Sequence, residues 1–130
     1  MDISSYAFLD AALALFSSFA LFQQARAADD ERVTCSAYNL LLSVDGDHAD
    51  ISSKQASKAA YAFVRQVGDN TQTQGLLTTK FTELRDEMPG KMTAENVAAF
   101  RAVHDERCKA LLKSAWCEAY KGFSANACVE

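Results

Sequence analysis

The chain has 130 residues, which is enough for one small domain. Hydrophobic residues make up 49% of it and charged residues 23%, so it is neither disordered nor wholly embedded in a membrane. The net charge of −4 leaves no basic surface for nucleic acid, and one proline with five glycines argues against a turn-rich all-β fold.

The N-terminal segment has the layout of a secretory signal peptide. An apolar run over residues 6–22 is followed by a small-x-small tripeptide at residues 25–27 and then by polar chain. We therefore expect cleavage after residue 27, with residues 1–27 as signal peptide and residues 28–130 as a single helical domain. An uncleaved N-terminal anchor is the alternative, because no Lys or Arg precedes the run and Asp10 interrupts it.

Two helices are predicted in the first half of the mature chain. The first covers about residues 33–44, and its apolar face consists of Cys35, Tyr38, Leu41 and Leu42. The second covers about residues 53–67, with Ser52 and Gln55 spaced as a capping box and Gly68 as its stop. Its apolar stripe consists of Ala56, Ala60, Phe63, Val64 and Val67.

Two more helices are predicted in the second half. The third covers about residues 71–88, with Thr71 and Gln74 as a capping box and the face Leu77, Phe81, Leu84 and Met88. The fourth covers about residues 94–123, with Thr93 as its N-cap. Its face consists of Val97, Phe100, His104, Cys108, Leu111, Ala115 and Ala119. No segment has the pattern of a strand, so we expect an all-α, disulfide-stapled bundle of three to four helices.

The four cysteines predict two disulfides, because an even number in a short exported chain is typical of paired thiols. Cys108 and Cys117 cannot bridge each other on a continuous helix, since their side chains point apart. We therefore prefer Cys35–Cys108 with Cys117–Cys128. The pairing of Cys35 with Cys117 and of Cys108 with Cys128 is the alternative.

Catalytic and metal-binding patterns are weak in this sequence. His104 and Cys108 have the spacing of zinc ligands, but a full site would also need Cys35 and a further ligand such as His48. We expect no metal and no cofactor. We also expect no enzymatic activity; the alternative is a small enzyme with His48 or His104 as its base.

An aromatic stripe on the last predicted helix is the candidate partner surface. Trp116, Tyr120 and Phe123 lie at i, i+4 and i+7, on a different side from the core face. The stripe is either additional core or an exposed patch for a partner.

Together these features favour a periplasmic or secreted protein that binds other proteins of the cell envelope. An inhibitor, an immunity-type protein and a chaperone all fit this description. The expected partner is a protein partner or client. We expect no nucleic acid, and contact with a membrane only through residues 1–27 if that segment is uncleaved.

The chain is similar in outline to the HdeA-type acid-stress chaperones of the periplasm. The similarity consists of a short helical chain, Thr34-Cys35 near the mature N-terminus, and a late partner cysteine at Cys108. The resemblance implies a chaperone that exposes apolar surface when acid protonates its carboxylates.

Overall fold

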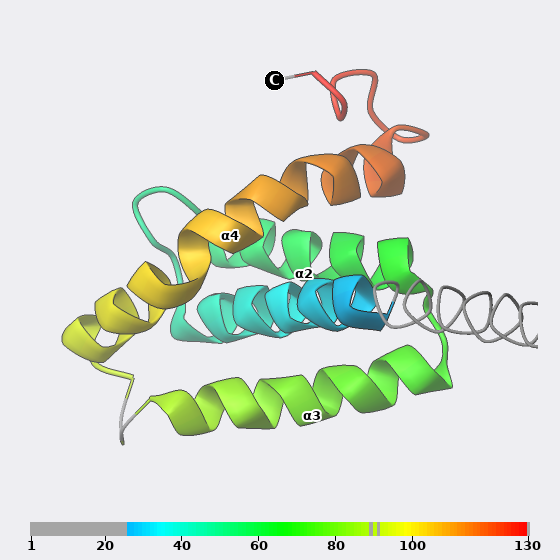
Figure 1. Cartoon of the computed structure of the whole chain (residues 1–130). Helices are drawn as coiled ribbons and strands as arrows, with labels where there is room; N and C mark the ends of the chain where they lie inside the picture. The colour runs from blue at the N-terminus through cyan, green and yellow to red at the C-terminus, as the bar shows by residue number, and fades with distance from the viewer. Residues whose placement is uncertain (1–25, 89, 91, 130) are drawn as a thin grey trace, which may run out of the picture. The chain divides into compact units, whose positions relative to one another are not determined.

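Four helical segments make up the part of the chain that the computed structural model describes, residues 26–88, 90 and 92–129 (Figure 1). No strand occurs among these residues, so the predicted all-α fold is confirmed. The predicted signal segment lies almost entirely outside the described residues. Glu31–Glu130 form one compact unit.

The first helix is longer than the sequence pattern predicted. Residues 26–45 are helical, whereas the prediction began at Val33. Residues 26–32 contain Ala, Arg and Glu, which are strong helix formers, so this polar stretch continues the helix. The predicted face is correct, because Cys35, Tyr38, Leu41 and Leu42 are all buried.

Helix α2, Ser53–Val67, has the predicted bounds and the predicted caps. The backbone N–H of Gln55 donates to Ser52 Oγ at 3.1 Å, and the N–H of Ser52 donates to Gln55 Oε1 at 2.9 Å. This reciprocal pair satisfies two donors at the start of the helix. Gly68 ends the helix with a φ of 128°, a conformation that favours glycine.

Helix α3, Thr71–Glu87, begins with a different cap from the one predicted. The N-cap is Asn70, whose Oδ1 accepts from the N–H of Thr73 at 2.9 Å. Thr71 is the first helical residue and not the cap. The two candidates are adjacent, and asparagine is the stronger N-cap of the pair.

Helix α4, Ala94–Tyr120, begins as predicted and ends three residues early. Thr93 Oγ1 accepts from the N–H of Asn96 at 3.2 Å. At the other end, the N–H of Ser124 donates to Tyr120 O at 2.9 Å and the chain turns. Phe123, predicted as the last helical residue, therefore lies in this turn.

The core lies between these helices. In Figure 1, α4 crosses the first helix and α2 on one side, and α3 runs along the other side. The first helix approaches α2 closely, because Ser36 Oγ donates to the carbonyl of Ala60 at 2.7 Å. The buried cluster draws on all four helices, and its largest members are Tyr38, Leu41, Leu42, Phe63, Leu84, Met88, Val97 and Phe100.

The structure pairs all four cysteines in the preferred way. Cys35 on the first helix bridges Cys108 on α4, and Cys117 near the end of α4 bridges Cys128 in the tail. The first bridge joins residues 73 apart in sequence and the second joins residues 11 apart. The first therefore fastens two helices, and the second holds the tail against its own helix.

Candidate functional site

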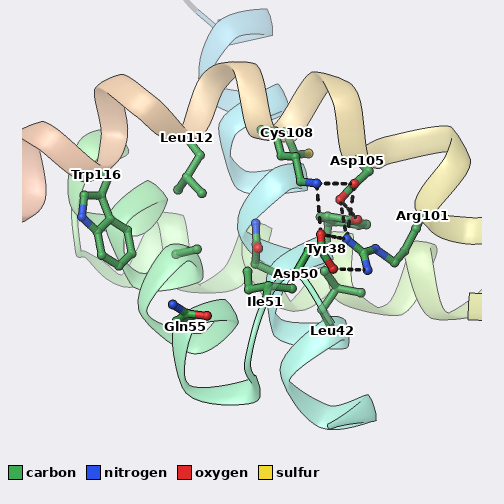
Figure 2. Close-up of a pocket in the computed structure, with 13 residues that line it drawn as sticks. Tyr38, Leu42, Asp50, Ile51, Gln55, Arg101, Asp105, Cys108, Leu112 and Trp116 are labelled. Atoms are coloured by element: carbon green, nitrogen blue, oxygen red, sulfur yellow. Dashed lines mark hydrogen bonds and ion pairs between the residues drawn. The ribbon is translucent and has the colours of Figure 1, made fainter. Parts of the chain in front are cut away.

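A cleft of about 290 Å³ opens beneath the middle of α4 (Figure 2). Its walls come from the first helix, the loop before α2, the start of α2 and α4. We call it the inner cleft. Its apolar lining consists of Leu42, Ile51, Ala59, Cys108, Leu112 and Trp116, and its polar lining of Tyr38, Asn39, Asp50, Gln55, Arg101, Asp105 and Lys109.

The two ends of the inner cleft differ in chemistry. Figure 2 shows Trp116 and Leu112 side by side on α4 at one end, and a group of bonded charges around Asp105 at the other. Tyr38 forms part of the wall near these charges and is only 2% exposed. The cleft therefore combines an apolar wall with a polar end, as ligand pockets commonly do.

The charged end is an ion-pair network of Asp50, Arg101, Asp105 and Lys109. Arg101 forms a two-pronged pair with the Asp50 carboxylate, at 2.8 Å and 2.5 Å, and lies 3.3 Å from Asp105. Lys109 Nζ lies 3.1 Å from Asp50 and 2.9 Å from Asp105. Each carboxylate thus contacts both cations. The network ties the loop before α2 to α4.

The hydroxyl of Tyr38 adds a partly buried hydrogen bond to this network. It donates to Asp105 Oδ1 at 2.5 Å and so links the first helix to α4. Burial and the adjacent Asp105 carboxylate raise the pKa of Tyr38 far above its usual value. The tyrosine therefore stays protonated and acts as a hydrogen-bond donor, not as a base.

The network holds both aspartates in their charged form. Hydrogen bonds from Arg101 and Lys109 lower the pKa of Asp50 far below its usual value. Burial of Asp105 works in the opposite direction, but the bonds from Tyr38 and Lys109 outweigh it, so the pKa of Asp105 is also lowered. Two carboxylates that both stay ionised do not form the acid–base pair that carboxylate catalysis requires.

A second hollow, of about 600 Å³, lies on the tail side of Trp116. We call it the tail hollow. One side of it is α4, and the other is the tail that the Cys117–Cys128 bridge holds in place. It is lined by Lys109, Ala110, Leu112, Lys113, Trp116, Ala127, Cys128 and Val129. Lys109, Leu112 and Trp116 also line the inner cleft, so the two hollows are neighbours along α4.

The three residues of the predicted aromatic surface differ in their surroundings. The rings of Trp116 and Tyr120 contact each other, with centroids 4.6 Å apart and planes tilted by 55°, and both pack against the core. Phe123 is 80% exposed in the turn beyond α4, where the guanidinium of Arg65 lies over its ring. The prediction extended the helix three residues too far, to Phe123, and the partner surface stays a prediction.

The two histidines lie apart and outside both hollows. His48 Nε2 lies 3.1 Å from the Asp45 carboxylate in the loop before α2. His104 Nε2 lies 2.8 Å from the Glu87 carboxylate, and its ring packs against Phe100. Neither lines the inner cleft or the tail hollow. Glu87 and Phe100, which contact His104, line a smaller hollow of about 230 Å³. The alternative enzyme site around His48 or His104 stays a prediction.

The zinc alternative lacks its ligands. Cys108 and Cys35 are joined in a disulfide, so neither sulfur offers a thiolate. Within residues 26–88, 90 and 92–129, no three His, Cys, Asp or Glu side chains are grouped in a way that could hold a metal ion.

The ion-pair network was not predicted from the sequence. Asp50, Arg101 and Asp105 were not among the candidate site residues named above. The i, i+4 spacing of Arg101, Asp105 and Lys109 on one helix was the available signal. No pattern among neighbouring residues indicated that Tyr38 and Asp50 would bond to these three side chains.

The chain matches no protein-family model, no curated protein and no solved structure. In the part of the chain that the structure describes, no helix has the length and hydropathy that a membrane span requires. The two hollows, the ion-pair network and the disulfides are the features of the fold that bear on function.

Proposed function

We propose that this chain is a non-enzymatic binding protein of the cell envelope, periplasmic or secreted, and that a partner protein docks in the tail hollow. Two disulfides are consistent with an oxidising compartment. Within the described residues no cysteine is free, which fits such a compartment as well.

The observation that supports docking is the way the tail hollow is built. The Cys117–Cys128 bridge holds the tail opposite Trp116, so that Val129 and Trp116 line the same hollow. Val129 is 71% exposed, and tryptophan is the side chain most often found at binding hot spots. A disulfide that holds a small apolar wall in place reduces the ordering cost of binding.

The apolar wall of the tail hollow indicates the chemistry of the partner. Trp116, Leu112 and Val129 line it, and Lys109, which also lines it, already pairs with Asp50 and Asp105. A partner segment with one apolar anchor side chain would complement this arrangement. An inhibitor or an immunity-type protein would use such a preformed surface.

Photo-crosslinking from the tail hollow tests this proposal. We expect p-benzoylphenylalanine at Val129 to give a discrete adduct in an envelope fraction, because the side chain lines the hollow and is exposed. The Trp116→Ala change should reduce the adduct at least tenfold, since it removes the anchor site. The measurement is the adduct band after irradiation, followed by its identification by mass spectrometry.

A matched control uses the same photo-reactive residue at Val44. That side chain is equally exposed, at 68%, but belongs to the end of the first helix and lines neither hollow. The same adduct from both positions, or an adduct that survives Trp116→Ala in a variant of unchanged stability, would exclude the tail hollow as the docking site.

An acid-stress chaperone is the second candidate, and the ion-pair network is the observation that favours it. The network fastens the loop before α2 over the inner cleft through Asp50. If acid protonates Asp50 and Asp105, the loop loses its bonds to Arg101 and Lys109. The apolar lining of the cleft, with Ile51 and Leu112, would then be exposed to unfolded clients.

The acid response has a defined direction. The pKa values of Asp50 and Asp105 are lower in the folded chain than the usual value near 3.8. Their contribution to stability is therefore fully present above about pH 4 and is lost progressively as the pH falls further. We expect the Asp50→Asn variant to be less stable than wild type by about 1 kcal/mol at pH 7, and this gap to narrow between pH 4 and pH 2. Urea unfolding at several pH values measures it.

The control variant is Asp86→Asn, because Asp86 is exposed and pairs only loosely with the neighbouring Arg85, at 3.9 Å. The free energy of unfolding of this variant should depend on pH in the same way as that of the wild type. A gap for Asp50→Asn that stays constant from pH 7 to pH 2 would rule out the network as the acid-sensitive element. The chaperone candidate further requires that the protein suppress client aggregation near pH 2 and not at pH 7.

A further inference from the structure

The inner cleft has the properties of a small-molecule site that is separate from partner docking. Its deep wall is formed by side chains of the fold itself: Tyr38, Leu42, Ala59 and Cys108 are each less than 5% exposed. A volume of about 290 Å³ is several times that of one water molecule and lies at the small end of the range for ligand pockets.

The space exists because small residues face it from α2. Ala59 lines the cleft where a larger side chain would project into it, and one turn earlier Gln55 is directed back to its capping bond with Ser52. On the opposite side, Leu112 and Trp116 reach down from α4 into the lining of the cleft (Figure 2). The cleft is thus a local gap between α2 and α4, which pack against each other elsewhere along their lengths.

The ion-pair network excludes charged ligands from this site. Asp50 and Asp105 carry two negative charges, and Arg101 and Lys109 carry two positive charges, all within 3.3 Å of a partner. The polar end is therefore neutral as a whole. A ligand carboxylate could approach Arg101 only by displacing an aspartate, which would leave that aspartate unpaired.

The cleft also has polar groups that suit a neutral ligand. Asn39 lines it and uses its Nδ2 to donate to Cys35 O at 2.9 Å, and Gln55 uses its Oε1 to accept from Ser52 N. An amide carries both a donor and an acceptor, so each side chain has a second polar atom with which to bind one hydroxyl or carbonyl.

We infer that the inner cleft binds a small, uncharged and mainly apolar molecule, such as an alkyl chain or aromatic ring with one hydroxyl or carbonyl group. The apolar part lies against Leu112, Trp116 and Ala59, and the single polar group points towards the amides. This goes beyond the proposed docking function, because the ligand enters the inner cleft and not the tail hollow.

Trp116 is the only tryptophan in the chain and lines both hollows, so its fluorescence reports binding, and the Ala59 variants below assign that binding to the inner cleft. The experiment titrates the full-length protein at pH 7 with 1-octanol and, separately, with octanoate, which has the same chain length and a negative charge. We expect a saturable change in emission with octanol, and an affinity for octanoate at least tenfold weaker.

The matched variants are Ala59→Leu and Ala94→Leu. The first fills the cleft and should weaken octanol binding at least tenfold, whereas the second adds the same atoms at an exposed position near the start of α4 and should bind like wild type. Ala59→Val replaces Ala59→Leu if circular dichroism shows that the leucine variant is unfolded.

Three outcomes would overturn the inference: no saturable response of the wild type to octanol, octanoate binding as tight as octanol binding, or full octanol binding by a folded Ala59 variant. None of these outcomes bears on the crosslink from Val129, which uses the other side of Trp116. The two proposals can therefore fail independently.

Discussion

Replacing Cys35 and Cys108 together by alanine should lower the free energy of unfolding by about 4 kcal/mol. The bridge closes a loop of 73 residues, and the chain-entropy model assigns a stabilisation of this size to such a loop. Small domains are stable by only about 5–15 kcal/mol, so the loss is a large fraction of the total. Urea unfolding of the double variant measures it.

The double replacement of Cys117 and Cys128 by alanine is the matched control. That bridge closes a loop of 11 residues and should contribute less, about 3 kcal/mol by the same model. If this variant loses more free energy of unfolding than the first, the Cys35–Cys108 bridge is not the more stabilising of the two. Intact mass with and without reduction verifies that both bridges are formed in the starting material.

The disulfide pairing of the four cysteines could be predicted from the sequence because helix geometry excludes a bridge between Cys108 and Cys117. Cys108 and Cys117 lie nine residues apart on one helix and therefore point to different sides. The apolar period placed Cys35 and Cys108 on buried faces, which made them natural partners. The helices could be located for a similar reason, since their signals, such as the Ser52–Gln55 capping box, lie within a few neighbouring residues.

The candidate site could not be predicted in this way, because its parts come from distant segments. The Tyr38–Asp105 bond joins residues 67 apart, and the Arg101–Asp50 pair joins residues 51 apart. On α4 alone, Arg101 and Asp105 look like any exposed i, i+4 pair. Only the packing of the loop before α2 against α4 turns them into an interhelical network.

The inner cleft and the tail hollow could not be predicted from the sequence for a different reason. A hydrophobic period indicates which side chains face inward, but not whether they fill the space between two helices. Leu42 and Cys108 belong to the predicted apolar faces, and yet they line the inner cleft. The end of α4 also differs from the prediction, because the helix ends at Tyr120, three residues before Phe123.

The Phe63→Ala variant should lose about 3–5 kcal/mol of stability, the cost typical of removing a buried phenylalanine ring. Phe63 is completely buried in α2 and belongs to the core cluster. The neighbouring Tyr61 is 47% exposed beside Arg65, so Tyr61→Ala should cost less than about 1 kcal/mol. Thermal and urea unfolding of the two variants give the comparison, and equal losses would contradict the packing of α2 described above.

The stability cost of Phe63→Ala can be compared with that of filling the inner cleft at Ala59. It lies one helical turn after Ala59, so both side chains project from nearly the same face of α2. Space opened at Phe63 has no function and costs several kcal/mol, whereas the space in front of Ala59 is part of the native fold. Filling it in Ala59→Leu should therefore cost far less than emptying the site of Phe63. The stability difference alone does not identify a ligand site, because filling a packing defect would also cost little. Loss of octanol binding by the folded Ala59→Leu variant is the result that distinguishes a ligand site from a defect.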